Sequence, residues 1–128
     1  MRVIVQAVAN KRRNMKIGFT GHRNKMVSHE DLEKLMIIYP GSTWIHGGAV
    51  GFDQQVESFA NKNKIQQIVH HPDYKQYGKA APLIRNRKIV EDVDILIACW
   101  DGRKQGGTYY TINFASKSKK QIKILSTV

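Results

Sequence analysis

Three glycine-rich turns each follow an apolar run and precede a helical pattern. They lie at residues 18–23 (Gly-Phe-Thr-Gly-His-Arg), 47–53 (Gly-Gly-Ala-Val-Gly-Phe-Asp) and 106–108 (Gly-Gly-Thr). A strand that passes through glycines onto a helix N-terminus presents backbone N–H groups and the positive end of the helix dipole to an anion. Any one of these turns is equally compatible with a tight strand-to-helix connection. Three in one small chain predict one composite phosphate site.

Charged side chains lie close to these turns. The basic run at residues 85–88 (Arg-Asn-Arg-Lys) falls near the start of a predicted helix, where the helix dipole disfavours positive charge. An anionic partner explains this position better than helix stability does. The alternatives are a solvated face of the helix or ion pairs with Glu91, Asp92 or Asp94. Two roles are compatible with Asp53: it stabilises the helix N-terminus, or it hydrogen-bonds the sugar or base of a ligand.

Each candidate residue has an expected role. Donors to phosphate are expected from Gly21, Gly47, Gly48, Ala49 and Thr108, and positive charge from Arg23, Arg85 and Arg87. Sugar or base recognition is expected from Asp53 or Asn86, phosphate donation from His22, and base stacking from the loop aromatics Tyr74, Tyr77 and Trp100. The complete predicted ligand-binding set is Thr20, Gly21, His22, Arg23, Gly47, Gly48, Ala49, Gly51, Asp53, Arg85, Asn86, Arg87, Asp101, Gly106, Gly107 and Thr108.

Several common sites are excluded by the sequence. The turns match neither the Gly-x-Gly-x-x-Gly dinucleotide fingerprint nor a P-loop, which needs a Gly-Lys-Ser/Thr step. The five histidines show no metal-binding spacing, and the single cysteine, Cys99, rules out an internal disulfide or a multi-cysteine metal site. Cys99 lies in an apolar run and is expected to be a buried thiol. No metal is predicted.

The chain has 128 residues, 41% of them hydrophobic, and a net charge of +11. This length fits one domain with a substantial core. The positive excess is peripheral, because residues 1–14 and 102–128 carry basic but no acidic side chains. Basic ends can bind nucleic acid, but a solvated charged surface is the more common explanation. No apolar run is long enough to span a membrane and no signal peptide is evident, so we expect a cytoplasmic protein.

Strand and helix signals alternate from Met15 onward, which predicts an α/β, Rossmann-like three-layer domain with a mostly parallel sheet of about five strands. Residues 1–14 form a basic N-terminal extension, either an edge strand or a linker, and residues 15–128 form the domain. Strands are expected at about 16–20, 43–46, 65–70, 93–99 and 122–125, and helices at about 29–38, from 52 onward, 81–92 and 108–117. Residues 71–79 are expected to be turn-rich. In such a sheet the glycine turns all meet at the C-terminal edge.

The order and spacing of these motifs resemble the SLOG superfamily, most closely its YspA-like branch. The resemblance covers about residues 15–125 and rests on the three glycine turns, Arg85-Asn86-Arg87, Trp100-Asp101 and the segment 106–111. It implies binding or sensing of a nucleotide or nucleotide-derived phosphorylated ligand, with ADP-ribose or an NAD-like molecule among the ligands considered. It also implies that the protein is able to form a homodimer.

Two relatives in this superfamily supply alternative functions. The LOG phosphoribohydrolases cleave the N-glycosidic bond of nucleoside monophosphates, and Arg87-Lys88 matches their helix Arg-Lys pair. Their acidic residue after Gly-Thr is missing here, because Thr108 is followed by Tyr109, Tyr110 and Thr111. Such cleavage usually needs a carboxylate, so enzyme activity would fall to Asp53 or Asp101 together with Arg87. The DNA-processing protein A resembles the chain at residues 85–87, which makes single-stranded DNA binding the other alternative.

Overall fold

Five strands and five α-helices alternate along residues 15–128, the part of the chain that this computed structural model describes. The strands are β1 (Lys16–Gly21), β2 (Thr43–His46), β3 (Gln67–Val69), β4 (Ile95–Cys99) and β5 (Gln121–Leu125). The helices are α2 (His29–Ile38), α3 (Phe52–Lys62), α4 (Tyr74–Tyr77), α5 (Ala81–Asp92) and α6 (Gly107–Lys117), with a 3-10 helix at Gly78–Ala80. The prediction for residues 1–14 lies outside the described residues.

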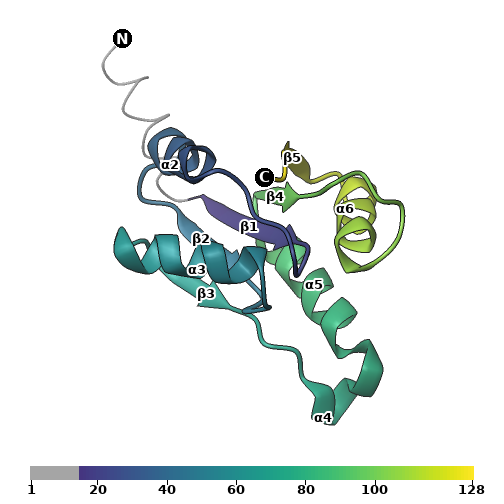
Figure 1. Cartoon of the computed structure of the whole chain (residues 1–128). Coiled ribbons are helices and arrows are strands. Elements are labelled where there is room, and N and C mark those ends of the chain that lie inside the picture. Colours follow the sequence, from purple (N-terminus) through teal and green to yellow (C-terminus); the bar gives the residue numbers. More distant parts are fainter. Residues whose placement is uncertain (1–14) are drawn as a thin grey trace.

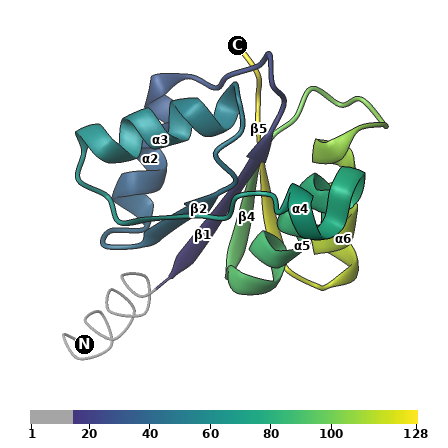
Figure 2. The same ribbon diagram turned by 90° about the horizontal axis from the view of Figure 1, so that it is seen from below.

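The five strands form one sheet in the order β3-β2-β1-β4-β5, and every neighbouring pair is parallel. Helices α2 and α3 cover one face of the sheet, and α5 and α6 cover the other (Figures 1 and 2). The predicted three-layer, Rossmann-like α/β fold is therefore confirmed. The chain builds outward from β1 to β3 and then returns to place β4 on the other side of β1. In parallel sheets this switch point opens a crevice at the C-terminal strand ends.

The core is built around the strands nearest the middle of the sheet. Every residue of β4 is buried, which is why its sequence is a continuous apolar run. Trp44 lies between Phe19 and Phe59, with ring centroids 4.8 and 5.5 Å away. Cys99 is a buried core residue, as predicted, and burial raises the pKa of its thiol to about 11.

Local sequence signals set several element boundaries correctly. The predicted start of α2 at residue 29 is confirmed: Ser28 is the N-cap, and its side chain accepts a hydrogen bond from the Asp31 N–H. The predicted strand at 65–70 is shorter, Gln67–Val69, because β3 is an edge strand with one neighbour. The segment 71–79 is also more ordered than predicted: α4 forms there because the Asp73 side chain caps it at the Gln76 N–H. No helix within residues 15–128 is long and apolar enough to cross a bilayer.

Candidate functional site

A polar cavity of about 440 Å³ opens at the switch point, beyond the C-terminal ends of β1 and β4. We call it the polar cavity. It brings together residues from the loop after β1, the glycine loop after β2, the start of α5 and the loop before α6. Its lining residues are Phe19, Thr20, Gly21, His22, Arg23, Asn24, Ala49, Asp53, Pro82, Leu83, Arg85, Asn86, Arg103, Gln105, Gly106, Gly107 and Thr108.

The N-terminus of α6 forms one wall of the polar cavity. Gly106 precedes the helix with φ 93° and ψ 178°, a backbone conformation that side chains with a Cβ rarely adopt. No side chain among residues 15–128 caps this end, so the first-turn N–H groups are available at the positive end of the helix dipole. Thr108, also in the first turn, is 5% exposed and lines the cavity. This wall has the chemistry of an anion site.

Three arginines add positive charge around the cavity. Arg23 is exposed on the loop after β1. Arg85 is fixed by its hydrogen bonds: its Nη1 donates to the Gly47 carbonyl at 2.7 Å and its Nε donates to Asn86 Oδ1 at 2.7 Å. Arg103 enters from the loop before α6 and forms an ion pair with Asp101. The alternative of ion pairs between the 85–88 run and nearby acids is not observed within the described residues.

The glycine loop after β2 does not present its N–H groups to the cavity. The N–H groups of Gly47 and Ala49 donate to Asp53 Oδ2, at 3.1 and 3.2 Å, and the Gly48 N–H donates to His46 Nδ1 at 3.0 Å. The carboxylate of Asp53, in the first turn of the following helix, is thus the acceptor for two of the three N–H groups. Donation from these three residues to phosphate stays a prediction, and it would require Asp53 and His46 to release these N–H groups. In this conformation the loop is a support for the site rather than an anion cradle.

Asp53 lies in the first turn of α3, as the role at the helix N-terminus requires, and its carboxylate also accepts hydrogen bonds from the preceding loop, a contact that the sequence did not predict. The residue is 7% exposed, and its second oxygen, Oδ1, is buried without a hydrogen-bond partner among the described residues. Burial raises the pKa of this carboxyl, against the opposing effects of the two loop N–H groups and of Arg85. Of the cavity-lining residues, Asp53 alone carries a carboxyl group. Asp53 thus places a desolvated carboxyl group in the wall of the cavity.

Gly47 and Gly51 act through their lack of a side chain, and neither lines the cavity. A Cβ at Gly47 would collide with the Arg85 guanidinium, so glycine lets Arg85 reach the loop. A Cβ at Gly51 would collide with the backbone carbonyl of Arg23 and come within 2.6 Å of the His22 carbonyl oxygen. Gly51 also has φ +91°. Gly47 thus allows Arg85 of α5 to approach the loop after β2, and Gly51 allows the loop after β1 to approach the start of α3. The sequence analysis interpreted both glycines as ligand contacts and did not predict these packing roles.

His22 and Asp101 connect the loops that follow β1 and β4. His22 Nε2 lies 3.1 Å from Asp101 Oδ1 and 3.3 Å from the Asp101 backbone nitrogen. Burial is the main cause of the lowered pKa of His22, whereas hydrogen bonds from Arg103 hold the pKa of Asp101 below its usual range. Asp101 does not line the polar cavity. Its carboxylate instead positions Arg103, a cavity residue that the sequence analysis counted only as part of the basic C-terminal region.

The remaining predicted residues lie elsewhere. Arg87 faces a neighbouring groove, with its guanidinium carbon 4.8 Å from the centroid of the Phe114 ring. None of the three aromatics proposed for base stacking lines the polar cavity: Trp100 stacks on Tyr109, and Tyr74 and Tyr77 lie on α4. The cavity residues that the sequence analysis missed are Phe19, Asn24, Pro82, Leu83, Arg103 and Gln105. Phe19, Asn24, Arg103 and Gln105 lie within or near a glycine turn, and Pro82 and Leu83 directly precede the basic run at 85–88; this proximity does not identify them individually.

Within residues 15–128 no cluster of three or more His, Cys, Asp or Glu side chains has the arrangement of a metal site. Comparison of the chain with protein-family models, with curated proteins and with solved structures finds no match.

Proposed function

We propose that the protein binds a nucleotide or a nucleotide-derived phosphorylated ligand in the polar cavity. The observation that carries this proposal is that one cavity combines donors suited to an anion with a carboxylate acceptor suited to a hydroxyl group. The free first turn of α6 and the exposed Arg23 suit a phosphate, and the unpartnered Oδ1 of Asp53 suits a sugar hydroxyl. A phosphosugar carries both groups. The resemblance of the motifs to the SLOG superfamily supports the same ligand class, and membership of that superfamily is part of the proposal.

Ribose 5-phosphate and nucleoside monophosphates are expected to raise the melting temperature of the protein. A ligand at 100 times its dissociation constant adds about 2.7 kcal/mol to the free energy of unfolding. Arg23→Ala should weaken binding about 10-fold or more, because it removes a charge-assisted contact to phosphate. Lys34→Ala is the matched control, since Lys34 is an exposed cation on α2 away from the cavity. Isothermal titration calorimetry of the three proteins measures the difference.

Two results would contradict the proposal. One is the absence of any shift with phosphosugars or nucleotides, including ADP-ribose and NAD. The other is an equal loss of affinity in Arg23→Ala and Lys34→Ala, which would indicate diffuse attraction by the net charge. Binding of single-stranded DNA with a steep salt dependence, without nucleotide binding, would favour the alternative related to the DNA-processing protein.

A second function, hydrolysis of the N-glycosidic bond of a nucleoside monophosphate, is favoured by one observation. Asp53 lines the cavity with a buried carboxyl group whose pKa is raised and whose Oδ1 has no hydrogen-bond partner among the described residues. This group has the properties needed to activate water or to stabilise an oxocarbenium-like transition state, whereas Asp101 is paired with Arg103. If this function is correct, the protein releases free base from a nucleoside monophosphate, and Asp53→Asn abolishes the release while retaining binding. Binding without base release would leave binding or sensing as the function.

A further inference from the structure

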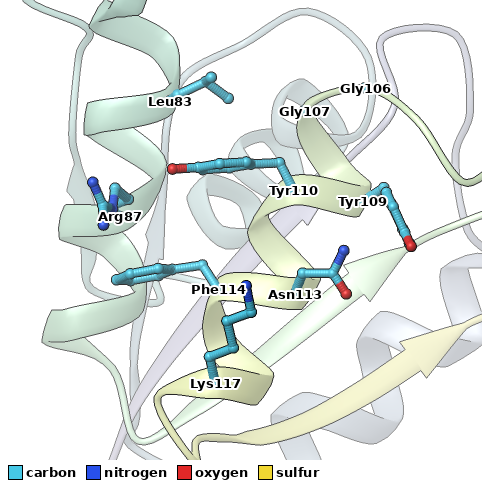
Figure 3. Close-up of a pocket in the computed structure, with 9 residues that line it drawn as sticks. All are labelled: Leu83, Arg87, Gly106, Gly107, Tyr109, Tyr110, Asn113, Phe114 and Lys117. Carbon is cyan, nitrogen blue, oxygen red and sulfur yellow. The ribbon is translucent and has the colours of Figure 1, made fainter.

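A second, larger cavity of about 760 Å³ lies between α5 and α6, directly beside the polar cavity. We call it the aromatic groove. Figure 3 shows its lining: Tyr110 and Phe114 project from successive turns of α6 toward α5, and Arg87 faces them from α5. The complete set of lining residues is Leu83, Arg87, Gly106, Gly107, Tyr109, Tyr110, Asn113, Phe114 and Lys117.

The two cavities meet at the N-terminus of α6. Leu83, Gly106 and Gly107 line both of them. Of these shared residues Leu83 alone carries a side chain, so a ligand whose phosphate is held at this helix end lies at the boundary between the two cavities. Because the shared residues include two glycines, no side chain of the loop before α6 separates the two cavities at this point.

The lining of the groove suits a flat, uncharged ring with acceptor atoms at its edge. Tyr110 is 36% exposed, so a large part of its side chain is open to the groove. Phe114 is half-buried and carries the Arg87 guanidinium over its ring, a packing that keeps this aromatic surface in place. Arg87 and Lys117 supply hydrogen-bond donors, and the side-chain amide of Asn113 supplies both donors and acceptors. No carboxylate is present among the residues that line the groove.

From this arrangement we infer that the aromatic groove binds the base of the nucleotide, while the polar cavity binds its sugar and phosphate. The inference rests on the proposed function and assigns the two halves of the ligand to different cavities. The exposed ring of Tyr110 provides the stacking surface, and Phe114, with the Arg87 guanidinium over its ring, forms the adjoining apolar wall. The cationic donors favour a base with an acceptor-rich edge, of which the O6 and N7 atoms of guanine are the best example.

The test compares ligands with and without a base on matched variants. Dissociation constants are measured for ribose 5-phosphate and for GMP, AMP, UMP and CMP. The best-bound nucleoside monophosphate, expected to be GMP, should bind roughly 10- to 100-fold more tightly than ribose 5-phosphate. Tyr110→Ala should remove most of this difference and leave the affinity for ribose 5-phosphate unchanged. Tyr74→Ala is the control, because Tyr74 is an exposed tyrosine that lines neither cavity.

The outcomes separate this inference from the proposed function. If ribose 5-phosphate binds but no nucleoside monophosphate binds more tightly, the base subsite is disproved and the phosphosugar site stands. If a nucleotide binds more tightly and the gain survives in both Tyr110→Ala and Phe114→Leu, the base lies elsewhere and the inference is equally disproved. If neither ribose 5-phosphate nor any nucleotide binds, the proposed function itself fails. Circular dichroism and melting temperatures confirm that each variant is folded.

Discussion

Asp53→Ala is expected to lower the free energy of unfolding by about 2–6 kcal/mol, because it leaves the N–H groups of Gly47 and Ala49 without their acceptor. For a domain with a typical stability of about 5–15 kcal/mol this is a large fraction. Asp53→Asn retains an oxygen that accepts from the loop, so its loss should be less than half as large. Urea unfolding at neutral pH measures both variants, and equal stability of Asp53→Ala and the wild type would contradict the role assigned to the carboxylate.

Asp53 also makes the free energy of unfolding depend on pH, and the burial of its carboxyl group determines the direction of this dependence. Because the pKa of Asp53 is raised above its ordinary value of 3.8, the folded protein retains a proton that the unfolded chain has already lost. The contribution of this group to the free energy of unfolding therefore falls as the pH rises from about 3.8 through the folded-state pKa. Asp53→Asn removes this decline. Urea unfolding of both proteins across this pH range should show that the free energy of unfolding of the wild type falls relative to that of Asp53→Asn as the pH rises, and parallel profiles would contradict the assignment.

Gly51→Ala is expected to lower the free energy of unfolding by at least about 2 kcal/mol more than Gly102→Ala does. The two glycines have nearly the same φ, +91° and +92°, so both substitutions carry similar backbone strain, about 1–3 kcal/mol. Around Gly102 the described part of the chain has nothing within 4 Å of an added Cβ. At Gly51 the Cβ meets the backbone carbonyls of His22 and Arg23, which cannot move without shifting the whole loop. The comparison isolates this collision from the strain.

Gly51→Ala should also weaken phosphosugar binding, because the displaced loop carries His22 and Arg23 at the polar cavity. Any Gly51→Ala protein that remains folded is titrated with ribose 5-phosphate beside Gly102→Ala. Similar stability losses in the two variants would mean that the contact between the loop after β1 and the start of α3 is adaptable. In that case Gly51 would have only a conformational role.

The sequence alone determined the features that depend on residues close to one another along the chain. The boundaries predicted for α2 and α5 are correct because local signals set them: Ser28 caps the start of α2, Pro40 and Gly41 follow its end, and Pro82 lies in the first turn of α5. The parallel sheet followed from alternating strand and helix patterns. Eleven of the predicted binding residues line the polar cavity, because parallel strands bring their C-terminal ends to one edge. These residues are Thr20, Gly21, His22, Arg23, Ala49, Asp53, Arg85, Asn86, Gly106, Gly107 and Thr108.

Only the tertiary structure decided which atoms at that edge are available to a ligand. The glycine loop after β2 and the one before α6 look equivalent in sequence, yet Asp53 engages the first and nothing among the described side chains caps the second. Arg85 and Arg87 are two residues apart, yet they face different cavities, because two positions on a helix are separated by about 200°. Whether a backbone N–H group already has a hydrogen-bond partner, and which way a side chain points, depend on packing between segments that are distant in the sequence. The sequence therefore located the candidate site, and the tertiary structure decided which of its groups are available to a ligand.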